Sequence, residues 1–162
     1  MVKKKIKVKI LFYQTYLRLI KNSAGSCLFR DLFALVNGQK RNITEGGRLS
    51  CAFYVSAILR IFGLINKLCP TVNGLIRELK KSGWREIKKP KPGSVIIWVA
   101  KKFSDGSIHK HAGFYLGENK AVSNGVKRRY PIFHHWTYGR SNGKPKRQIE
   151  AIFWRSGLDR WA

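Results

Sequence analysis

The residue best suited to act as a nucleophile is Cys51, which follows a glycine-led turn and opens an apolar helical pattern. Ser50 before it is a preferred N-cap residue, and Gly63 is a typical helix stop. A thiol in the first helical turn lies near the positive end of the helix dipole, which favours the thiolate. Side chains at spacings of three and four give this predicted helix a face for burial: Cys51, Val55, Ile58, Leu59 and Phe62. Taken alone, Cys51 is better explained as a small buried hydrophobe, which is the commoner role of a cysteine.

A partner base is present in His111, at the start of a predicted strand over residues 110–117. Because side chains alternate along a strand, His111 shares a face with Gly113, opposite Ala112 and Phe114. Gly113 leaves space for another element to approach that face, and we expect the thiol-bearing helix to be that element. A cysteine at a helix start and a distant histidine on a strand form the arrangement that a Cys/His nucleophilic pair requires.

A third residue should hold the imidazole of His111 in one tautomer, and the next strand offers Asn124 and Ser123. If residues 118–119 form a two-residue turn, Gly113 pairs with Asn124 on the His111 face. A longer turn would place Ser123 there instead. An amide carbonyl accepts firmly from an imidazole N–H, whereas a hydroxyl does so less firmly. We therefore predict Asn124 as the third catalytic residue, with a role in an Asn-Gly turn as its alternative.

The adjacent residues His134 and His135 form the other conspicuous polar group. Neighbours in a strand face opposite ways, so at most one of them can join the site. A structural role is our first interpretation, and a substrate-lining role beside Trp136 is the second. Ligation of one metal ion by two such neighbours is awkward, so we predict neither a metal nor another cofactor.

His109 is expected to be an exposed loop residue, and Cys27 and Cys69 to be buried structural thiols. Three cysteines without C-x-x-C spacing do not indicate a disulfide framework or a zinc site. The residues between 10 and 20 are apolar, but Gln14 and Arg18 interrupt them, which argues against a signal peptide. We accordingly expect a cytoplasmic protein or one exported by a non-classical route. No apolar run approaches the roughly 20 residues of a transmembrane helix, so we predict no transmembrane segment.

The charge of the chain is strongly positive. Its 162 residues include 33 Lys and Arg against 8 Asp and Glu, for a formal net charge of +25. Such a balance points to polyanionic partners: nucleic acid, anionic lipid or anionic wall polymer. A hydrophobic content of 44% supports a globular core, and we expect a monomer.

The patterns along the chain predict an α+β fold, with helices packed on an antiparallel sheet. Besides the Cys51 helix, we predict helices over 13–20, 28–36 and 71–81, and strands over 94–100, 110–117, 121–124 and 148–154. The strand over 94–100 is almost continuously apolar, so we expect it in the centre of the sheet. We expect residues 1–45 to form a basic N-terminal helical segment and residues 46–162 the core, together a single compact domain.

Three short motifs in this order resemble the NlpC-type cysteine peptidases of bacterial cell walls: a cysteine opening a helix, Pro92-Gly93 before an apolar strand, and His111-Ala112-Gly113-Phe114-Tyr115-Leu116-Gly117. The related CHAP amidases and peptidases share this layout. The resemblance implies a papain-like fold for the core over residues 46–162, cleavage of amide bonds in peptidoglycan peptides, and Cys51 and His111 as nucleophile and base. The chain departs from the family pattern: it has Ser50-Cys51-Ala52-Phe53 for Asp-Cys-Ser-Gly, and Ser94 for the aspartate after Pro-Gly.

The leading hypothesis is therefore a cysteine peptidase or amidase held on anionic wall polymers by its charge. A rival hypothesis is a nucleic-acid-binding module. In it, residues 127–130 together with Trp136 and Tyr138 supply phosphate contacts and stacking platforms for bases. A third is a catalytically inactive relative retained for polyanion binding.

Overall fold

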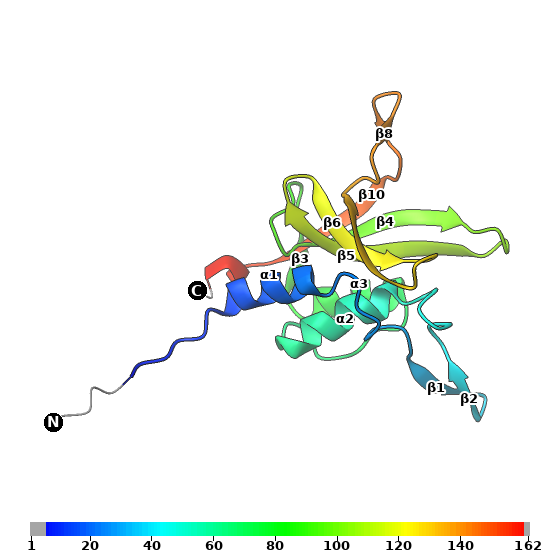
Figure 1. The fold of residues 1–162 in the computed structure, drawn as a ribbon, viewed down its shortest axis with the longest axis horizontal. Coiled ribbons are helices and arrows are strands. Elements are labelled where there is room, and N and C mark those ends of the chain that lie inside the picture. The colour runs from blue at the N-terminus through cyan, green and yellow to red at the C-terminus, as the bar shows by residue number, and fades with distance from the viewer. Residues whose placement is uncertain (1–5, 161–162) are drawn as a thin grey trace.

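One antiparallel sheet of six strands organises the computed structural model, which describes residues 6–160 (Figure 1). Its spatial order is β3 (Trp84–Glu86), β10 (Ile149–Arg155), β4 (Val95–Lys102), β5 (Ile108–Gly117), β6 (Lys120–Gly125) and β7 (Tyr130–His135). The apolar strand β4 lies between β10 and β5, which confirms its predicted central position.

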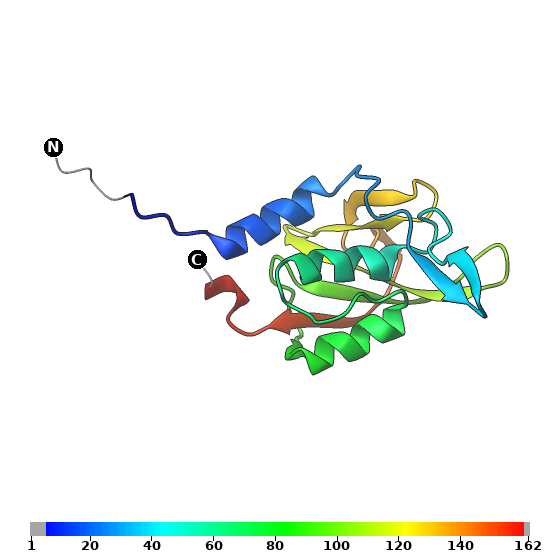
Figure 2. The same ribbon diagram turned by 90° about the horizontal axis from the view of Figure 1, so that it is seen from below.

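Three helices lie against one face of this sheet: α1 (Phe12–Asn22), α2 (Cys51–Ile61) and α3 (Val72–Lys81). Figure 2, turned to show that side, has the helices in front of the strands. The structure thus confirms an α+β architecture. The chain ends its regular structure with a short 3₁₀ helix, η1 (Leu158–Arg160).

The helices begin and end where local chemistry requires. The Thr71 hydroxyl caps α3 by accepting a hydrogen bond from the Gly74 amide, as its residue type predicts. Gly63, with φ of 61°, takes the left-handed conformation just beyond α2. Ser50 does not cap α2 with its side chain, because its hydroxyl donates to the Phe29 carbonyl instead.

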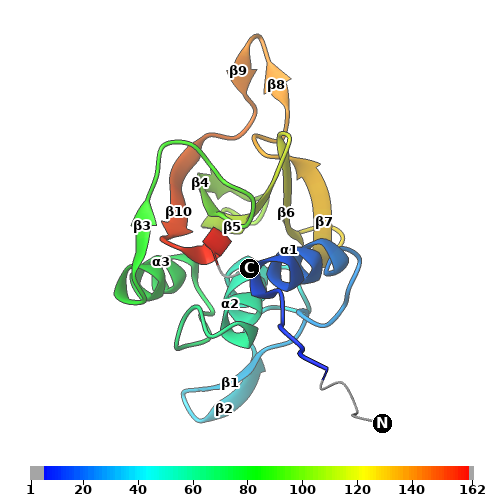
Figure 3. The same ribbon diagram turned by 90° about the vertical axis from the view of Figure 1, so that its left-hand side faces the viewer.

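Two small hairpins stand outside the six-stranded sheet: β1 (Phe33–Val36) with β2 (Gln39–Asn42), and β8 (Arg140–Ser141) with β9 (Lys144–Pro145). They project in opposite directions from the body of the protein, as Figures 1 and 3 agree. The predicted helix over 28–36 is wrong. Asn37 and Gly38 both have positive φ, of 50° and 77°, so they form a two-residue hairpin turn rather than a helix end.

The main hydrophobic core lies between the helices and the sheet. Tyr16 and Ile20 of α1 are fully buried in it together with Tyr54 and Val55 of α2 and Phe114 of β5. The N-terminal segment over 1–45 therefore contributes to this shared core, although beyond α1 it contains the β1–β2 hairpin rather than a further helix.

A smaller core covers the opposite face of the sheet. It consists of Ile96, Trp98 and Ala121, with Tyr115, Trp136, Tyr138 and Ile149 packed against them. Among the described residues, no helix is long and apolar enough to cross a membrane.

Candidate active site

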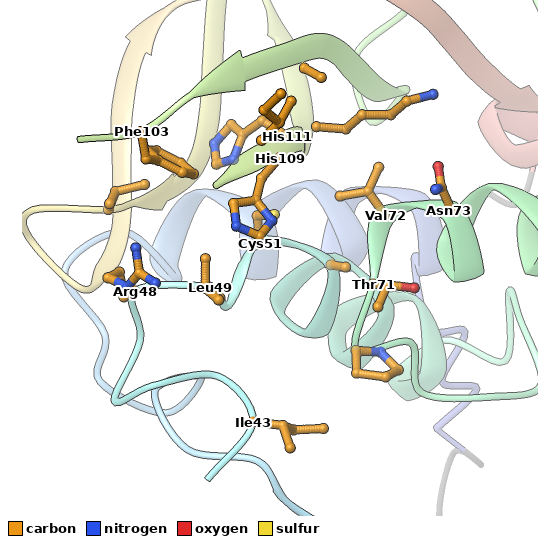
Figure 4. Close-up of a pocket in the computed structure, with 16 residues that line it drawn as sticks. Ile43, Arg48, Leu49, Cys51, Thr71, Val72, Asn73, Phe103, His109 and His111 are labelled. Carbon is orange, nitrogen blue, oxygen red and sulfur yellow. The ribbon is translucent and has the colours of Figure 1, made fainter. Parts of the chain in front are cut away.

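Cys51 and His111 line the same pocket, which has a volume of about 430 Å³. Figure 4 shows them with His109, Arg48 and Thr71 around this space. The thiol is presented by the first residue of α2 and the imidazole by β5. Within the described chain, no hydrogen bond joins the thiol to the imidazole. The structure thus places the predicted nucleophile and base beside one cavity, without direct pairing.

Backbone amides favour the charged form of the Cys51 thiol. The N–H groups of Ala112, Ala52 and Cys51 itself each act to lower its pKa, as does the positive charge of Arg147. Burial of the thiol outweighs them and raises its pKa above the ordinary value. The lowered pKa predicted from the helix start is therefore wrong for this conformation.

His111 is the first and buried member of a series of side-chain hydrogen bonds. Its Nε2 lies 2.9 Å from the Ser123 hydroxyl oxygen, which lies 2.8 Å from Nε2 of His134 and 3.0 Å from the Tyr138 hydroxyl. Nδ1 of His134 lies 2.8 Å from the carbonyl oxygen of His135. The imidazole of His111 is thereby fixed through β6 to the end of β7.

The position of each proton in this series of hydrogen bonds can be assigned by starting from its last acceptor, the His135 carbonyl oxygen. A carbonyl only accepts, so Nδ1 of His134 carries hydrogen. Burial lowers the pKa of His134, so its ring is neutral and its Nε2 accepts from Ser123. The Ser123 oxygen in turn accepts from Tyr138 and from Nε2–H of His111. Nδ1 of His111 is then the basic nitrogen.

Burial also keeps His111 neutral. Its pKa lies well below the ordinary value, first because the ring is buried, and further because of the positive charge of Arg147 and the nearby His134. At neutral pH the site thus holds an uncharged thiol and an uncharged imidazole. Such a pair can work by general-base catalysis, with the proton moving as the thiol attacks.

Asn124 does not orient His111, which corrects the prediction. Its side-chain Nδ2 donates to the carbonyl oxygen of Gly47, 2.6 Å away, in the loop before α2. Within the described residues, its buried Oδ1 has no hydrogen-bond partner. Ser123, the alternative from a longer turn, takes the position beside the imidazole.

Asn124 lies on the other face of β6 from the one predicted because of a β-bulge, and not because the turn has a different length. Lys120 pairs with Gly117 across the expected two-residue turn, but the register then shifts by one residue on β5, so Ala121 pairs with Tyr115. Gly113 is consequently opposite Ser123. Because a one-residue shift exchanges the two faces of a strand, Asn124 points to the helix side.

The Cys51 helix does not occupy the space beside Gly113, contrary to the prediction from the sequence. A Cβ there would lie 2.5 Å from the Val122 carbonyl oxygen, 2.6 Å from the Ser123 Cβ and 3.1 Å from the Trp98 ring. The approaching groups are therefore those of β4 and β6, and not α2, which packs on the Ala112 face. The missing side chain lets Ser123 and Trp98 lie next to the His111 ring.

Arg147, between β9 and β10, is a member of the site that the sequence did not single out. Its guanidinium lies 5.7 Å from the Tyr138 ring centroid, and its Nη2 donates to the Val99 carbonyl at 3.3 Å. Its charge favours the thiolate of Cys51 and the neutral form of His111. Among the described residues, its buried Nε has no hydrogen-bond partner.

Of the two adjacent histidines, only His134 faces the site, in agreement with strand alternation. His135 instead accepts hydrogen bonds from the Thr137 and Gly139 amides and holds the following turn. Tyr138, expected only as a base-stacking residue, is stacked on His134 with ring centroids 4.1 Å apart. Sequence alone carried no signal for this contact.

The other expectations had mixed outcomes. His109 lies half-buried on β5 and lines the pocket, so it is not an exposed loop residue. Cys69 is buried as predicted, but Cys27 is exposed. Within residues 6–160, no group of three or more His, Cys, Asp or Glu side chains could hold a metal ion.

A comparison with protein-family models found no match, and a search of curated proteins likewise found none.

Proposed function

We propose that this protein is a cysteine amidohydrolase in which Cys51 is the nucleophile and His111 the base. The observation that supports this most is the hydrogen-bonded chain from His111 through Ser123 to His134. It fixes a buried imidazole in the tautomer whose Nδ1 can accept a proton, beside the pocket that holds a cysteine at a helix start.

In the proposed reaction, Nδ1 of His111 takes the thiol proton while the sulfur of Cys51 attacks an amide carbonyl carbon. The oxyanion of the tetrahedral intermediate accepts hydrogen bonds from backbone N–H groups at the start of α2, including that of Ala52. His111 then gives its proton to the leaving amine, and an acyl-enzyme remains. A water molecule loses a proton to His111, attacks the thioester and releases the carboxylic acid, while the proton returns to the sulfur.

Ser123, His134 and Tyr138 are proposed as positioning residues. Once Nδ1 of His111 is protonated, its Nε2–H still donates to Ser123, so the ring keeps its orientation through both proton transfers. His134 and Tyr138 hold the Ser123 oxygen from two other directions. The amide of Asn124 acts at a distance from the imidazole by holding the loop at Gly47.

The substrate class rests on the resemblance to NlpC-type and CHAP enzymes, whose cysteine helix lies against an antiparallel sheet in a papain-like fold. We propose amide bonds in peptidoglycan peptides as the substrate. The net charge of +25 would retain the enzyme on anionic wall polymers.

The test is digestion of purified peptidoglycan sacculi, with released amines and peptides analysed by mass spectrometry. Cys51→Ala and His111→Ala should abolish release. Ser123→Ala should lower kcat by roughly tenfold to a hundredfold, in line with the loss of a hydrogen bond worth about 1.5–3 kcal/mol. Asn124→Ala is the matched neighbour and should leave the pH profile unchanged.

Product release that persists in Cys51→Ala would overturn the mechanism. No release by the folded wild-type protein from sacculi or model peptides would favour an inactive relative. For the nucleic-acid hypothesis, the cations over 127–129 are exposed, as phosphate contacts require. Tyr138, however, already contacts His134 and Ser123, so its ring is less suited to stack on a base.

A further inference from the structure

The β1–β2 hairpin exposes large apolar side chains that the described chain does not cover. Phe33 is 58% exposed, Leu35 76% and Val36 44%. The hairpin projects from the protein on the side of α2, away from the β8–β9 hairpin (Figures 1 and 3). Isolated two-stranded hairpins are marginally stable in water, and clustered exposed apolar groups mark interaction surfaces.

Cations lie among these apolar side chains. The register places Leu35 opposite Lys40, and Ala34 opposite Arg41. The Lys40 ammonium lies 4.9 Å from the centre of the Phe33 ring. No acidic residue occurs in β1 or β2. We call Phe33, Leu35, Val36, Lys40 and Arg41 the hairpin surface.

This combination fits one kind of partner better than others. Apolar side chains can enter the boundary between headgroups and acyl chains while neighbouring Lys and Arg contact anionic headgroups. A second copy of the chain would bring two proteins of charge +25 together, which opposes association. A nucleic acid would use the cations but leave Leu35 and Val36 exposed to water.

We propose that the hairpin surface docks the protein on an anionic lipid membrane. The side chain of Ile43, the first residue after β2, lines the pocket that holds Cys51. Docking through the hairpin would therefore bring the pocket close to the membrane surface. The inference does not depend on Cys51 being a nucleophile.

Cosedimentation with vesicles tests the proposal with the full chain. We expect wild-type protein to bind vesicles of phosphatidylcholine and phosphatidylglycerol at least about tenfold more tightly than vesicles of phosphatidylcholine alone. The double variant Phe33→Ser, Leu35→Ser should weaken binding to the anionic vesicles by about tenfold or more. Phe133→Ser, which changes an apolar residue 52% exposed on β7, is the matched control and should bind like wild type.

A second pair of variants keeps the test independent of hairpin folding. Lys40→Glu with Arg41→Glu should weaken binding to the anionic vesicles by about tenfold or more. Lys144→Glu with Lys146→Glu makes the same charge change at the β8–β9 hairpin and should have a smaller effect. Equal losses for both pairs, or unchanged binding after Phe33→Ser, Leu35→Ser, would overturn the proposal. Wild-type protein that dimerises in light scattering through the hairpin, without binding vesicles, would identify a second copy as the partner instead.

Discussion

The hydroxyl of Ser123 lies within hydrogen-bonding distance of His111, His134 and Tyr138. One donated and two accepted bonds use its full capacity, so the direction of each bond is defined. A carboxamide could not accept twice and donate once through a single atom. Ser123 is therefore suited to link the two neutral rings of His111 and His134. An asparagine at position 123 would do this poorly.

Alkylation of Cys51 should report the protonation state of the site. Because burial raises the thiol pKa, the alkylation rate of Cys51 should climb steadily from neutral to alkaline pH in a Cys27→Ser, Cys69→Ser background. His111→Ala should change this profile little without substrate. Iodoacetamide kinetics followed by mass spectrometry provide the measurement.

A thiolate–imidazolium pair would give a different profile. The alkylation rate would then be high and flat across the neutral range, with a fall only at acid pH, and His111→Ala would remove that plateau. Cys27 in the wild-type protein is an exposed reference thiol for the same reagent.

At the scale of elements, the bulge between β5 and β6 decides which residues meet. Both strands and their turn lie where the sequence predicts them, yet one extra residue on β5 moves Ser123 to the His111 face. The same strand pair needs Gly113, because the backbone of β6 and the ring of Trp98 occupy the space of a side chain.

Gly113→Ala should therefore destabilise the fold by about 1–3 kcal/mol, as overpacking does in cores, and should lower activity by displacing Ser123. Thermal or urea unfolding measures the first effect. Gly125→Ala, at the end of the neighbouring strand β6, is the control, since the atom nearest its Cβ is the movable Cδ1 of Ile132 at 3.0 Å. Equal stability of the two variants would contradict the packing at Gly113.

At the scale of the whole molecule, the 33 Lys and Arg residues far outnumber the 8 Asp and Glu residues that could form ion pairs with them. The ion pairs among residues 6–160 are mostly at the surface, where each contributes little to stability: Arg48 with Glu45 and Asp105, Lys80 with Glu86, Lys91 with Asp159, Lys110 with Glu150, and Lys120 with Glu118. Most Lys and Arg therefore remain available to external anions.

Binding to polyanions should accordingly be sensitive to salt and insensitive to sequence. Retention on sacculi carrying anionic polymers, on duplex DNA and on single-stranded DNA should fall together as the salt concentration rises. Nucleic-acid binding that discriminates between sequences and survives high salt would instead favour a dedicated nucleic-acid-binding protein.

Acid should destabilise the folded protein below about pH 6.5, the ordinary pKa of histidine. His111 has a lower pKa when folded, so the unfolded chain binds the proton first and the free energy of unfolding decreases as pH falls. The slope approaches about 1.4 kcal/mol per pH unit for this one residue. Urea unfolding from pH 7.5 to 5 measures it.

His111→Gln should reduce that slope, because the substituted side chain does not titrate. His134 adds to the slope in the same direction, since its pKa is also lowered by burial. A free energy of unfolding that stays constant over this range would mean that the folded protein protonates these rings without cost.

The sequence alone determined part of the fold, namely α1, α2, α3 and the strands β4, β5, β6 and β10, and two members of the site. Regular spacing of apolar residues predicted α2 and α3, continuous β-branched residues predicted a central β4, and the Asn and Gly preferences of turns predicted the end of β5. Cys51 and His111 could be selected because their types and local contexts are themselves chemical signals. These features depend on neighbours a few positions away in the chain.

Only the tertiary structure decided the rest. Ser123, His134, Tyr138 and Arg147 come from separate elements, and their side chains meet through a bulge and a sheet register that local patterns do not encode. The pKa of Cys51 likewise depends on burial by elements far away in sequence. A one-residue change of register exchanges the faces of a strand at almost no local cost, so the identity of the orienting residue is fixed by packing across the whole sheet.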